Sequence, residues 1–190
     1  MIRVVLAAAI LLSAPFAVAH ATVHIVAFGD SATAGYLVPH ERAYPAQLQA
    51  ALRKRGYDVV VENAGISGDT ARGALRRFDS AIGPDTDIAI VEFGTNDLRQ
   101  GASRGDMERR LAEIVRSLKA RHIEVLVIGL GRLDLSAVAR ANGADYARWT
   151  LPPGKYRARD HAHYNAEGYA IVVSRMLPQV EAMIRRLTPK

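Results

Sequence analysis

The sequence predicts an α/β domain built around a mainly parallel sheet, because two hydrophobic periodicities alternate along the chain. Short runs rich in Val and Ile are nearly continuous in apolarity, which is typical of strands buried on both faces. Longer segments between them carry apolar residues three and four positions apart, as amphipathic helices do. This alternation favours parallel strands joined by helices. A length of 190 residues and a hydrophobic content of 49% suit one globular domain.

Four segments are expected to be strands with both faces buried, namely residues 22–28, 57–64, 86–93 and 123–130. A fifth, weaker strand is expected at residues 144–149. Strands of this length and composition, separated by helical segments, predict a sheet of about five strands.

Three longer segments are expected to be helices. The first, residues 44–56, has Pro45 near its start and Gly56 as a stop. The second opens with a Ser103-x-x-Asp106 capping pattern. Its expected buried face is Met107, Leu111, Ile114, Val115 and Leu118. The third begins at Asn165, and Pro178 should kink or split it. Its expected stripe is Ala170, Val173, Leu177, Val180 and Ile184.

The N-terminal residues 1–21 have the pattern of a signal peptide, which leaves residues 22–190 as the folded domain. Arg3 precedes a short apolar run, and small residues suit cleavage after Ala19 or Ala21. The alternatives are an uncleaved anchor or a buried first helix. Cleavage would leave no segment apolar and long enough to span a membrane stably, and a periplasmic or secreted location is expected. The chain has no cysteine, which excludes disulfides and thiol catalysis.

The chain is basic, with a net charge of +6 and a pI of about 9.9. Its Lys and Arg residues are scattered, so a solvated basic surface is favoured over a nucleic-acid interface. One local cluster is Lys155, Arg157 and Arg159, which either attracts anionic substrates or is a solvated loop. The sequence gives no indication of the oligomeric state.

Polar residues gather where the expected strands end. Ser31 follows the first strand in "GDSATAGY", Asn63 and Gly68 lie in "NAGISGDT", and Asn96 lies in "GTNDLRQG". The segment "RDHAHYN" follows the weak fifth strand. Because ligands bind at the carboxyl ends of parallel strands, these four segments are expected to converge on one site.

This set of residues suits acyl-transfer chemistry. A serine such as Ser31 needs a histidine base to accept its proton, and an acid to orient that base. The resulting oxyanion needs hydrogen-bond donors, which the backbone N–H groups of Ser31 and Gly68 and the side chain of Asn96 could supply. Each residue alone also has a structural explanation, as a turn, a loop cap or a left-handed glycine. The nearby acids Asp30, Asp69 and Asp97 are expected to fix loop backbones.

The four blocks "FGDSATAGY", "NAGISGDT", "GTND" and "DHAHYNAEGY" resemble the signature blocks of the SGNH (GDSL-type) esterases and lipases, in particular the thioesterase I, lysophospholipase and arylesterase branch. The resemblance runs from about Val23 to the C-terminus. It implies a three-layer α/β/α sandwich of flavodoxin-like type with a five-stranded sheet. It also implies a triad of Ser31, Asp160 and His163, an oxyanion hole of Ser31, Gly68 and Asn96, and no metal or cofactor.

One departure from the family concerns the segment between the fourth strand and the Asp-x-x-His block. This segment, residues 131–159, is shorter than is usual in that branch. A helix or a loop that lines the substrate site is therefore expected to be reduced, which leaves the substrate range open.

Spacing separates His163 from its neighbour His161. In a strand, the two histidines would share one face and Asp160 would point to the other, as suits a metal site. In a turn that leads into a helix at Asn165, residues three apart can face each other, so Asp160 reaches His163. His161 is then expected to be solvent-exposed. The other candidate metal ligands, His24, His40 and His122, do not supply an evident third ligand, because His24 and His122 are expected away from the site.

The residues therefore predict a serine ester hydrolase acting on small acyl-ester, thioester or lysophospholipid substrates through an acyl-enzyme. Two alternatives remain open. The same triad could transfer acyl groups to, or remove them from, carbohydrates, and the fold could also serve as a non-catalytic binding module.

Overall fold

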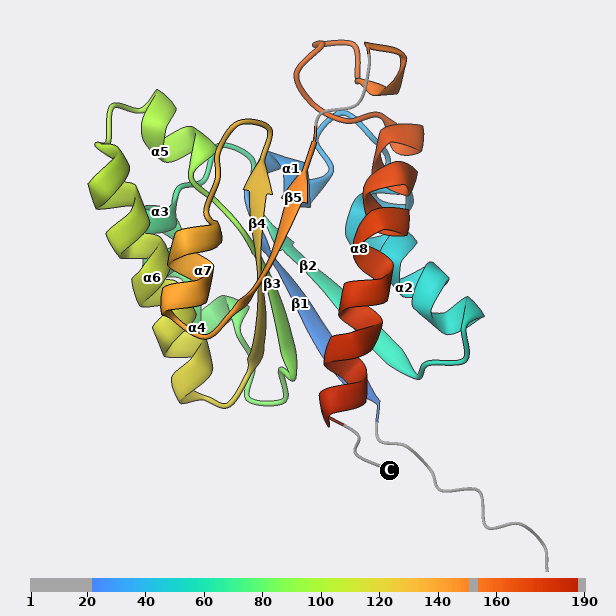
Figure 1. Ribbon diagram of the computed structural model, residues 1–190. Coiled ribbons are helices and arrows are strands. Elements are labelled where there is room, and N and C mark those ends of the chain that lie inside the picture. The colour runs from blue at the N-terminus through green and yellow to red at the C-terminus, as the bar shows by residue number, and fades with distance from the viewer. Residues whose placement is uncertain (1–21, 151–153, 188–190) are drawn as a thin grey trace, which may run out of the picture.

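A computed structural model describes residues 22–150 and 154–187 as a three-layer α/β/α sandwich (Figure 1). Its sheet has five parallel strands in the order β2-β1-β3-β4-β5. The strands are β1 (Val23–Gly29), β2 (Val59–Gly65), β3 (Ile88–Glu92), β4 (Glu124–Leu130) and β5 (Asp145–Trp149). The expected fold class and the weak fifth strand are thus confirmed. The expected signal peptide, residues 1–21, lies outside the described residues.

Strand register aligns the carboxyl ends of the three strands that precede the polar blocks. Gly29 at the end of β1 pairs with Gly65 of β2 on one side and with Glu92 of β3 on the other. The segments that follow these three strands therefore start side by side, at the upper edge of the sheet in Figure 1.

Helices cover the two faces of the sheet (Figure 1). Helices α2 (Tyr44–Lys54) and α8 (Ala166–Leu187) pack on one face, around a core that includes Leu48, Leu52 and Val180. The other face is covered by α3 (Ala71–Arg76), α4 (Phe78–Ala81), α6 (Arg104–Ala120) and α7 (Ser136–Ala141). Two short helices, α1 (Ser31–Ala34) and α5 (Thr95–Arg99), follow β1 and β3 at the carboxyl edge. Two 3₁₀ turns, η1 (His40–Arg42) and η2 (Gly154–Tyr156), complete these elements.

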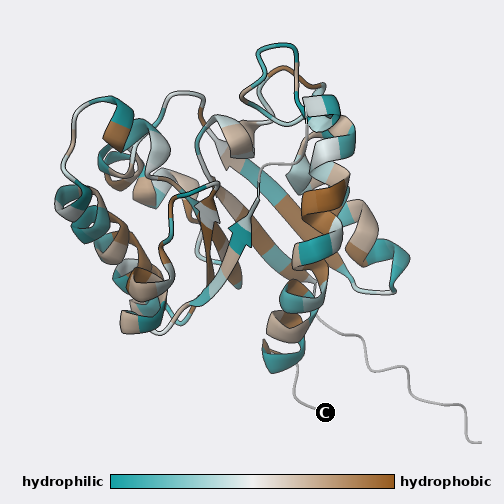
Figure 2. Cartoon of the chain, turned by 45° about the horizontal axis from the view of Figure 1, so that its top comes forward, coloured by the Kyte–Doolittle hydropathy of each residue, from teal (hydrophilic) through white to brown (hydrophobic). Residues whose placement is uncertain are grey.

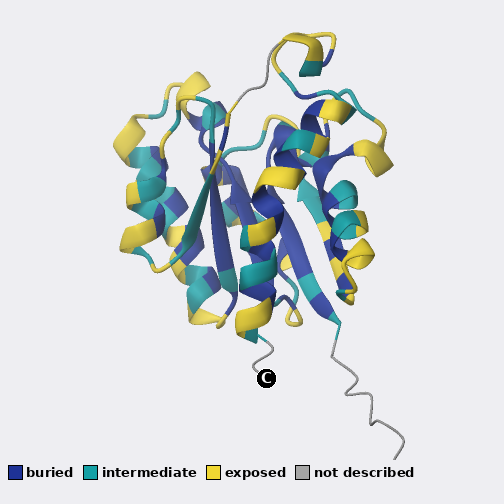
Figure 3. Cartoon of the chain, turned by 45° about the vertical axis from the view of Figure 1, so that its right-hand side comes forward, coloured by how far each residue is buried: buried dark blue, intermediate teal, exposed yellow. Residues whose placement is uncertain are grey.

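Helix α6 forms as its sequence predicts. The side chain of Ser103 accepts a hydrogen bond from the backbone N–H of Asp106, which caps the helix. All five residues of its predicted apolar face are buried. Its hydrophobic residues face the sheet in Figure 2, and exposed residues line the outward faces of the helices in Figure 3. No helix in the described part of the chain is long and apolar enough to cross a membrane.

One expectation about the strands was wrong. Strand β2 is not buried on both faces, because it is an edge strand and Val60 is 38% exposed. Of the two outcomes expected at Pro178, a kink or a split, the split does not occur, because helix α8 continues through this residue. Buried residues on both sides of the proline, Leu177 and Val180, pack in the same core. Of the stripe predicted for this helix, Ala170 is exposed and the other four residues are buried.

Candidate active site

Ser31 is the first residue of α1 and lies two residues after Gly29, the last residue of β1. The carboxylate of Asp30 accepts a hydrogen bond from the N–H of Ala32 at 3.0 Å and caps this short helix. The helix ends at Gly35, whose φ of 80° lies in the left-handed region that favours glycine. Ser31 is half-buried and is fixed at the carboxyl edge of the sheet.

Ser31, His163 and Asp160 form a hydrogen-bonded chain. The hydroxyl oxygen Oγ of Ser31 lies 2.8 Å from Nε2 of His163. Nδ1 of the same ring lies 2.5 Å from Oδ2 of Asp160. Because an ionised carboxylate only accepts, the ring donates from Nδ1, and a neutral ring then leaves Nε2 free to accept from the serine. The three residues thus stand in the order of nucleophile, base and orienting acid.

The turn between residues 159 and 163 gives Asp160 its orientation. Oδ1 of Asp160 accepts from the N–H groups of Ala162 and His163, at 3.1 and 3.0 Å. The hydrogen bond to the imidazole, followed by that to the backbone of His163, holds the pKa of Asp160 well below its usual range. The carboxyl group is therefore ionised at neutral pH. The predicted turn is confirmed, and α8 begins at Ala166 just after it.

The hydrogen bonds that join Ser31, His163 and Asp160 do not involve His161. Its residue is exposed, as predicted, and its φ of 58° is left-handed. Its carbonyl accepts a hydrogen bond from Arg157 at 2.8 Å. His163 is instead covered by the ring of Tyr36, whose centroid lies 4.9 Å from that of the imidazole. In the described part of the chain, no three His, Asp or Glu side chains gather as a metal site would require.

The three expected oxyanion donors come to the same edge but differ in their present partners. The backbone N–H groups of Ser31 and Gly68 have no hydrogen-bond acceptor among the described residues. Gly68 has a φ of 82°, and a Cβ built there would touch nothing within 4 Å. Asn96 is buried, and its amide donates to Oδ2 of Asp30 at 3.0 Å and to the carbonyl of Asp69 at 2.9 Å.

The acids beside these donors fix loop backbones, as predicted. Asp69 accepts from the N–H of Thr70 at 2.8 Å, and Asp97 accepts from the N–H of Ala71 at 2.9 Å. Asp30 caps α1 and also binds the amide of Asn96, so it connects the block of the serine with the block of the asparagine. Asn63 is structural as well, because its side-chain oxygen accepts from the N–H of Gly65.

Glu92 is a buried acid that the sequence reasoning missed. It ends β3 and is 1% exposed, and its Oε2 accepts from the hydroxyl of Thr33 at 3.2 Å. Burial, and then the nearby carboxylate of Asp30, raise the pKa of Glu92 well above its usual range. Burial also raises the pKa of Asp30. The one sequence signal was an acid at the end of an otherwise apolar strand.

A second residue missed was Arg77, between α3 and α4. Its guanidinium forms an ion pair with Asp69 and also donates to two strand-end carbonyls. Its neighbour Arg76 is exposed, so the sequence did not single out Arg77.

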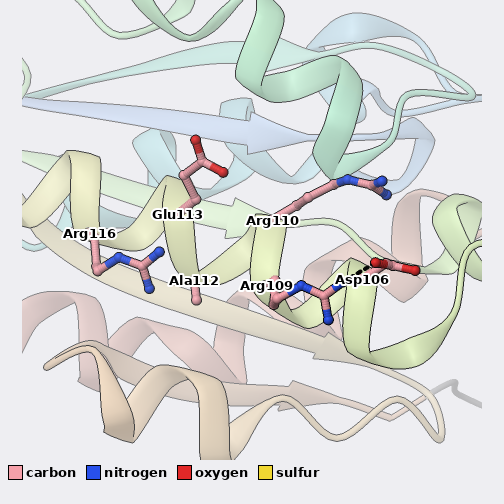
Figure 4. A pocket seen from close by; sticks show the side chains of 6 residues that line it. All are labelled: Asp106, Arg109, Arg110, Ala112, Glu113 and Arg116. Atoms are coloured by element: carbon pink, nitrogen blue, oxygen red, sulfur yellow. Dashed lines mark hydrogen bonds and ion pairs between the residues drawn. The ribbon is translucent and has the colours of Figure 1, made fainter.

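The pocket at Ser31 is small, with a volume of about 70 Å³. It is lined by Asp30, Ser31, Ala32, Thr95, Asn96, Arg99, Leu130, Ala162, His163 and Tyr164. The cation in this lining is Arg99, and the basic residues Lys155, Arg157 and Arg159 are not part of it. A larger hollow of about 590 Å³ lies on the outer face of α6 (Figure 4). It is lined by charged side chains such as Arg109 and Asp106, which pair with each other, and by no candidate nucleophile with a base, so we do not assign it as the active site.

A parallel α/β/α sandwich with this Ser–His–Asp arrangement at its carboxyl edge defines a protein of the SGNH-hydrolase class. The chain belongs to the GDSL-like lipase/acylhydrolase family, whose family model matches residues 27–171. The expected resemblance is therefore confirmed.

Curated relatives include an arylesterase of Vibrio mimicus, 32% identical over 113 residues, which covers 59% of this chain and 56% of that protein. Esterase TesA of Pseudomonas aeruginosa is 30% identical over 127 residues, covering 63% of each chain. The thioesterase 1/protease 1/lysophospholipase L1 of Escherichia coli is 32% identical over 121 residues, covering 63% of this chain and 56% of that protein. The chain thus matches less than two thirds of the length of these relatives.

Solved structures confirm the fold. The esterase EstA of a Pseudoalteromonas species superposes with a TM-score of 0.76 at 20% identity, covering 85% of this chain and 98% of that one. AlinE4, an SGNH-hydrolase family esterase, superposes with a TM-score of 0.67 at 28% identity, covering 90% of this chain and 99% of that one.

Proposed function

We propose that this protein is a serine ester hydrolase that cleaves carboxylic esters or thioesters through an acyl-enzyme. The observation that carries the proposal is the continuous hydrogen-bonded chain from Ser31 Oγ through His163 to Asp160, beside a small pocket. Family membership and the named esterase relatives support the same reaction class.

In the proposed first step, Nε2 of His163 accepts the hydroxyl proton while Oγ of Ser31 forms a bond to the substrate's acyl carbon. The imidazolium formed is stabilised by the ionised Asp160, whose hydrogen bond also fixes the ring. The tetrahedral intermediate collapses as the bond to the leaving group breaks, and His163 gives its proton to that group. A water molecule then gives a proton to the same nitrogen while its oxygen forms a bond to the acyl carbon. The second tetrahedral intermediate collapses as the bond from the acyl carbon to Oγ of Ser31 breaks, His163 returns the proton to Oγ, and the carboxylic acid is released.

The negative oxygen of each intermediate would accept from the backbone N–H groups of Ser31 and Gly68. Asn96 would become the third donor by exchanging the carbonyl of Asp69 for the oxyanion. The bond to the carboxylate of Asp30 is charge-assisted and stronger, so the bond to the neutral carbonyl is the one to be exchanged.

The size of the pocket favours short acyl groups. Its volume of about 70 Å³ is far below the roughly 300–1,000 Å³ of pockets that enclose drug-sized ligands. We therefore expect activity on nitrophenyl esters to be highest for acyl chains of a few carbons and to fall for long chains. A panel of nitrophenyl esters and thioesters of increasing chain length measures this preference, and equal rates across the panel would contradict it.

The experiment that tests the reaction class combines three variants with a nitrophenyl ester assay and labelling by a fluorophosphonate. Ser31→Ala should abolish labelling, and both Ser31→Ala and His163→Ala should lose nearly all hydrolysis. His161→Ala is the matched control, because this exposed histidine is not part of the hydrogen-bonded Ser31–His163–Asp160 chain. The His161→Ala variant should keep most of the activity. Full activity in Ser31→Ala, or a loss in His161→Ala equal to that in His163→Ala, would refute the mechanism.

We also propose that the protein is exported, on the basis of the signal-peptide pattern in residues 1–21. N-terminal sequencing of the mature protein should find a start at residue 20 or 22. A mature chain that keeps Met1 would contradict the proposal.

A further inference from the structure

Arg77 is a largely buried cation that contacts three segments of the site at once. Its side chain is 18% exposed, and Nε pairs with Oδ2 of Asp69 at 2.8 Å. Nη1 donates to the carbonyl of Ala64 at 2.8 Å, and Nη2 donates to the carbonyl of Gly29 at 3.2 Å. The guanidinium also stacks over the ring of Phe28 at 4.6 Å. All of its contacts therefore lie at the carboxyl ends of β1 and β2 and in the loop that follows β2.

The residues that Arg77 contacts are close neighbours of the expected oxyanion donors. Gly29 is two residues before Ser31, whose N–H is the first donor. Asp69 closes the turn that carries Gly68, because its N–H donates to the carbonyl of Ile66 at 3.1 Å. The carbonyl of Asp69 in turn accepts from the amide of Asn96. One guanidinium thus holds a neighbour of each of the three donors.

The residues around Asp69 hold its carboxylate in one position. A Cβ at Gly73 would lie 1.8 Å from Oδ1 of Asp69, so the carboxylate occupies space that only a glycine leaves open. The same oxygen accepts from the N–H of Thr70, and the hydroxyl of Thr70 accepts from the N–H of Gly73. The carboxylate of Asp69 is therefore seated in a fixed position between Arg77 and the start of α3.

We propose that Arg77 is a positioning residue that holds the oxyanion donors of Ser31, Gly68 and Asn96 in the arrangement needed by the tetrahedral intermediate. The inference rests on the proposed function, because it requires the reaction to form an oxyanion at Ser31. Arg77 does not touch the substrate in this role. It acts through Asp69 and through the strand-end carbonyls, and its planar, multidentate guanidinium suits three acceptors better than a lysine would.

The matched pair of variants is Arg77→Met and Arg76→Met. Arg76 is the preceding residue, is exposed, and its guanidinium donates to the carbonyl of Arg72 within its own helix. Both changes remove a positive charge and keep an unbranched side chain at adjacent positions. The assays are ester hydrolysis and the rate of fluorophosphonate labelling, each expressed per folded molecule.

Arg77→Met should lower kcat and the labelling rate by about 10²-fold, the usual effect of losing an oxyanion donor, while KM changes by less than about threefold. Arg76→Met should match the wild type in both assays. In Arg77→Ala, added methylguanidinium should restore part of kcat. A merely structural role predicts fewer folded molecules but an unchanged labelling rate for each of them.

Arg77→Lys covers the case in which Arg77→Met does not fold, since lysine keeps the charge beside Asp69 but cannot serve all three acceptors. It should fold and label more slowly than the wild type. A wild-type labelling rate in folded Arg77→Met or Arg77→Lys, or a change in KM with kcat unaltered, would overturn the inference about Arg77. Neither result would affect the proposed function. Failure of the wild-type protein to react with the fluorophosphonate would instead refute the proposed function.

Discussion

Replacing Gly65 with alanine should push the helix that carries Ser31, the proposed nucleophile, away from strand β2. Gly65 ends β2, and a Cβ built on it would lie 2.2 Å from the backbone nitrogen of Ala34 and 2.7 Å from the carbonyl carbon of Thr33. Both atoms belong to α1, the four-residue helix that begins with Ser31. Backbone atoms cannot rotate away, so the helix and the strand must separate by about 1 Å to reach an ordinary contact distance.

The size of the effect follows from that displacement. A misplacement of about 1 Å in an active site can cost about 10²-fold in rate, so we expect kcat/KM of Gly65→Ala to fall by about that factor. Overpacking of this kind costs about 1–3 kcal/mol, which corresponds to a decrease in Tm of about 2–12 °C for a chain of this size. A nitrophenyl ester assay and thermal unfolding measure the two effects separately.

Gly105→Ala is the matched control for the same chemical change. Gly105 lies in the first turn of the exposed side of α6, where a Cβ would meet only the end of the Arg109 side chain at 3.4 Å. This variant should keep full activity and gain up to about 1 kcal/mol, because alanine loses less entropy in a helix. Wild-type activity in Gly65→Ala would show that β2 does not fix Ser31, and would refute the reasoning.

Three further predictions concern stability. Tyr169→Phe should lower the free energy of unfolding by about 1–3 kcal/mol, because the hydroxyl of Tyr169 donates to the carbonyl of Ala32 at 2.9 Å in a buried region. Urea unfolding measures this loss, and an unchanged midpoint would contradict the prediction. Leu111→Ala should cost about 2–5 kcal/mol in the same assay, because Leu111 is fully buried on the inner face of α6, and activity per folded molecule should stay constant. Glu92→Gln should flatten the dependence of stability on pH. The pKa of Glu92 is raised by burial, so above pH 4.5, its usual pKa, the folded state keeps a proton that the unfolded state releases. Wild-type stability should therefore fall with rising pH, by about 1.4 kcal/mol for each pH unit for one proton, until Glu92 ionises in the folded state. Parallel wild-type and Glu92→Gln curves from about pH 4 to about pH 8 would contradict this assignment.

The sequence predicted correctly those elements that are specified by residues close together in the chain. In α6, a capping serine and five apolar residues on one face were enough, because both features act within the helix. In β2, the same approach failed, since an apolar run does not reveal whether a strand lies at the edge of the sheet. That position depends on the strand order, which places β2 at one edge and β1, β3 and β4 inside the sheet.

The residues of the candidate site likewise fall into those that the sequence could predict and those that it could not. Ser31, Gly68 and Asn96 could be predicted because each follows a strand, and parallel strands end at one edge. Arg77 and Glu92 could not, because their roles come from contacts with segments distant in sequence. Arg77 contacts a carbonyl 48 residues earlier in the chain, and nothing in the adjacent residues distinguishes it from Arg76.

The three acids of the strand-end blocks connect the blocks in a ring. Asp30 in the first block binds the amide of Asn96 in the third. Asp97, also in the third, accepts from the N–H of Ala71 just after the second, and Asp69 in the second pairs with Arg77. Arg77 then returns to the first block through the carbonyl of Gly29, which closes the ring. Because the ring joins all three blocks, the loss of one connection should disturb donors on both sides of it. This ring gives the strand-end acids a positioning role under the proposed mechanism, and their removal should lower kcat more than it raises KM.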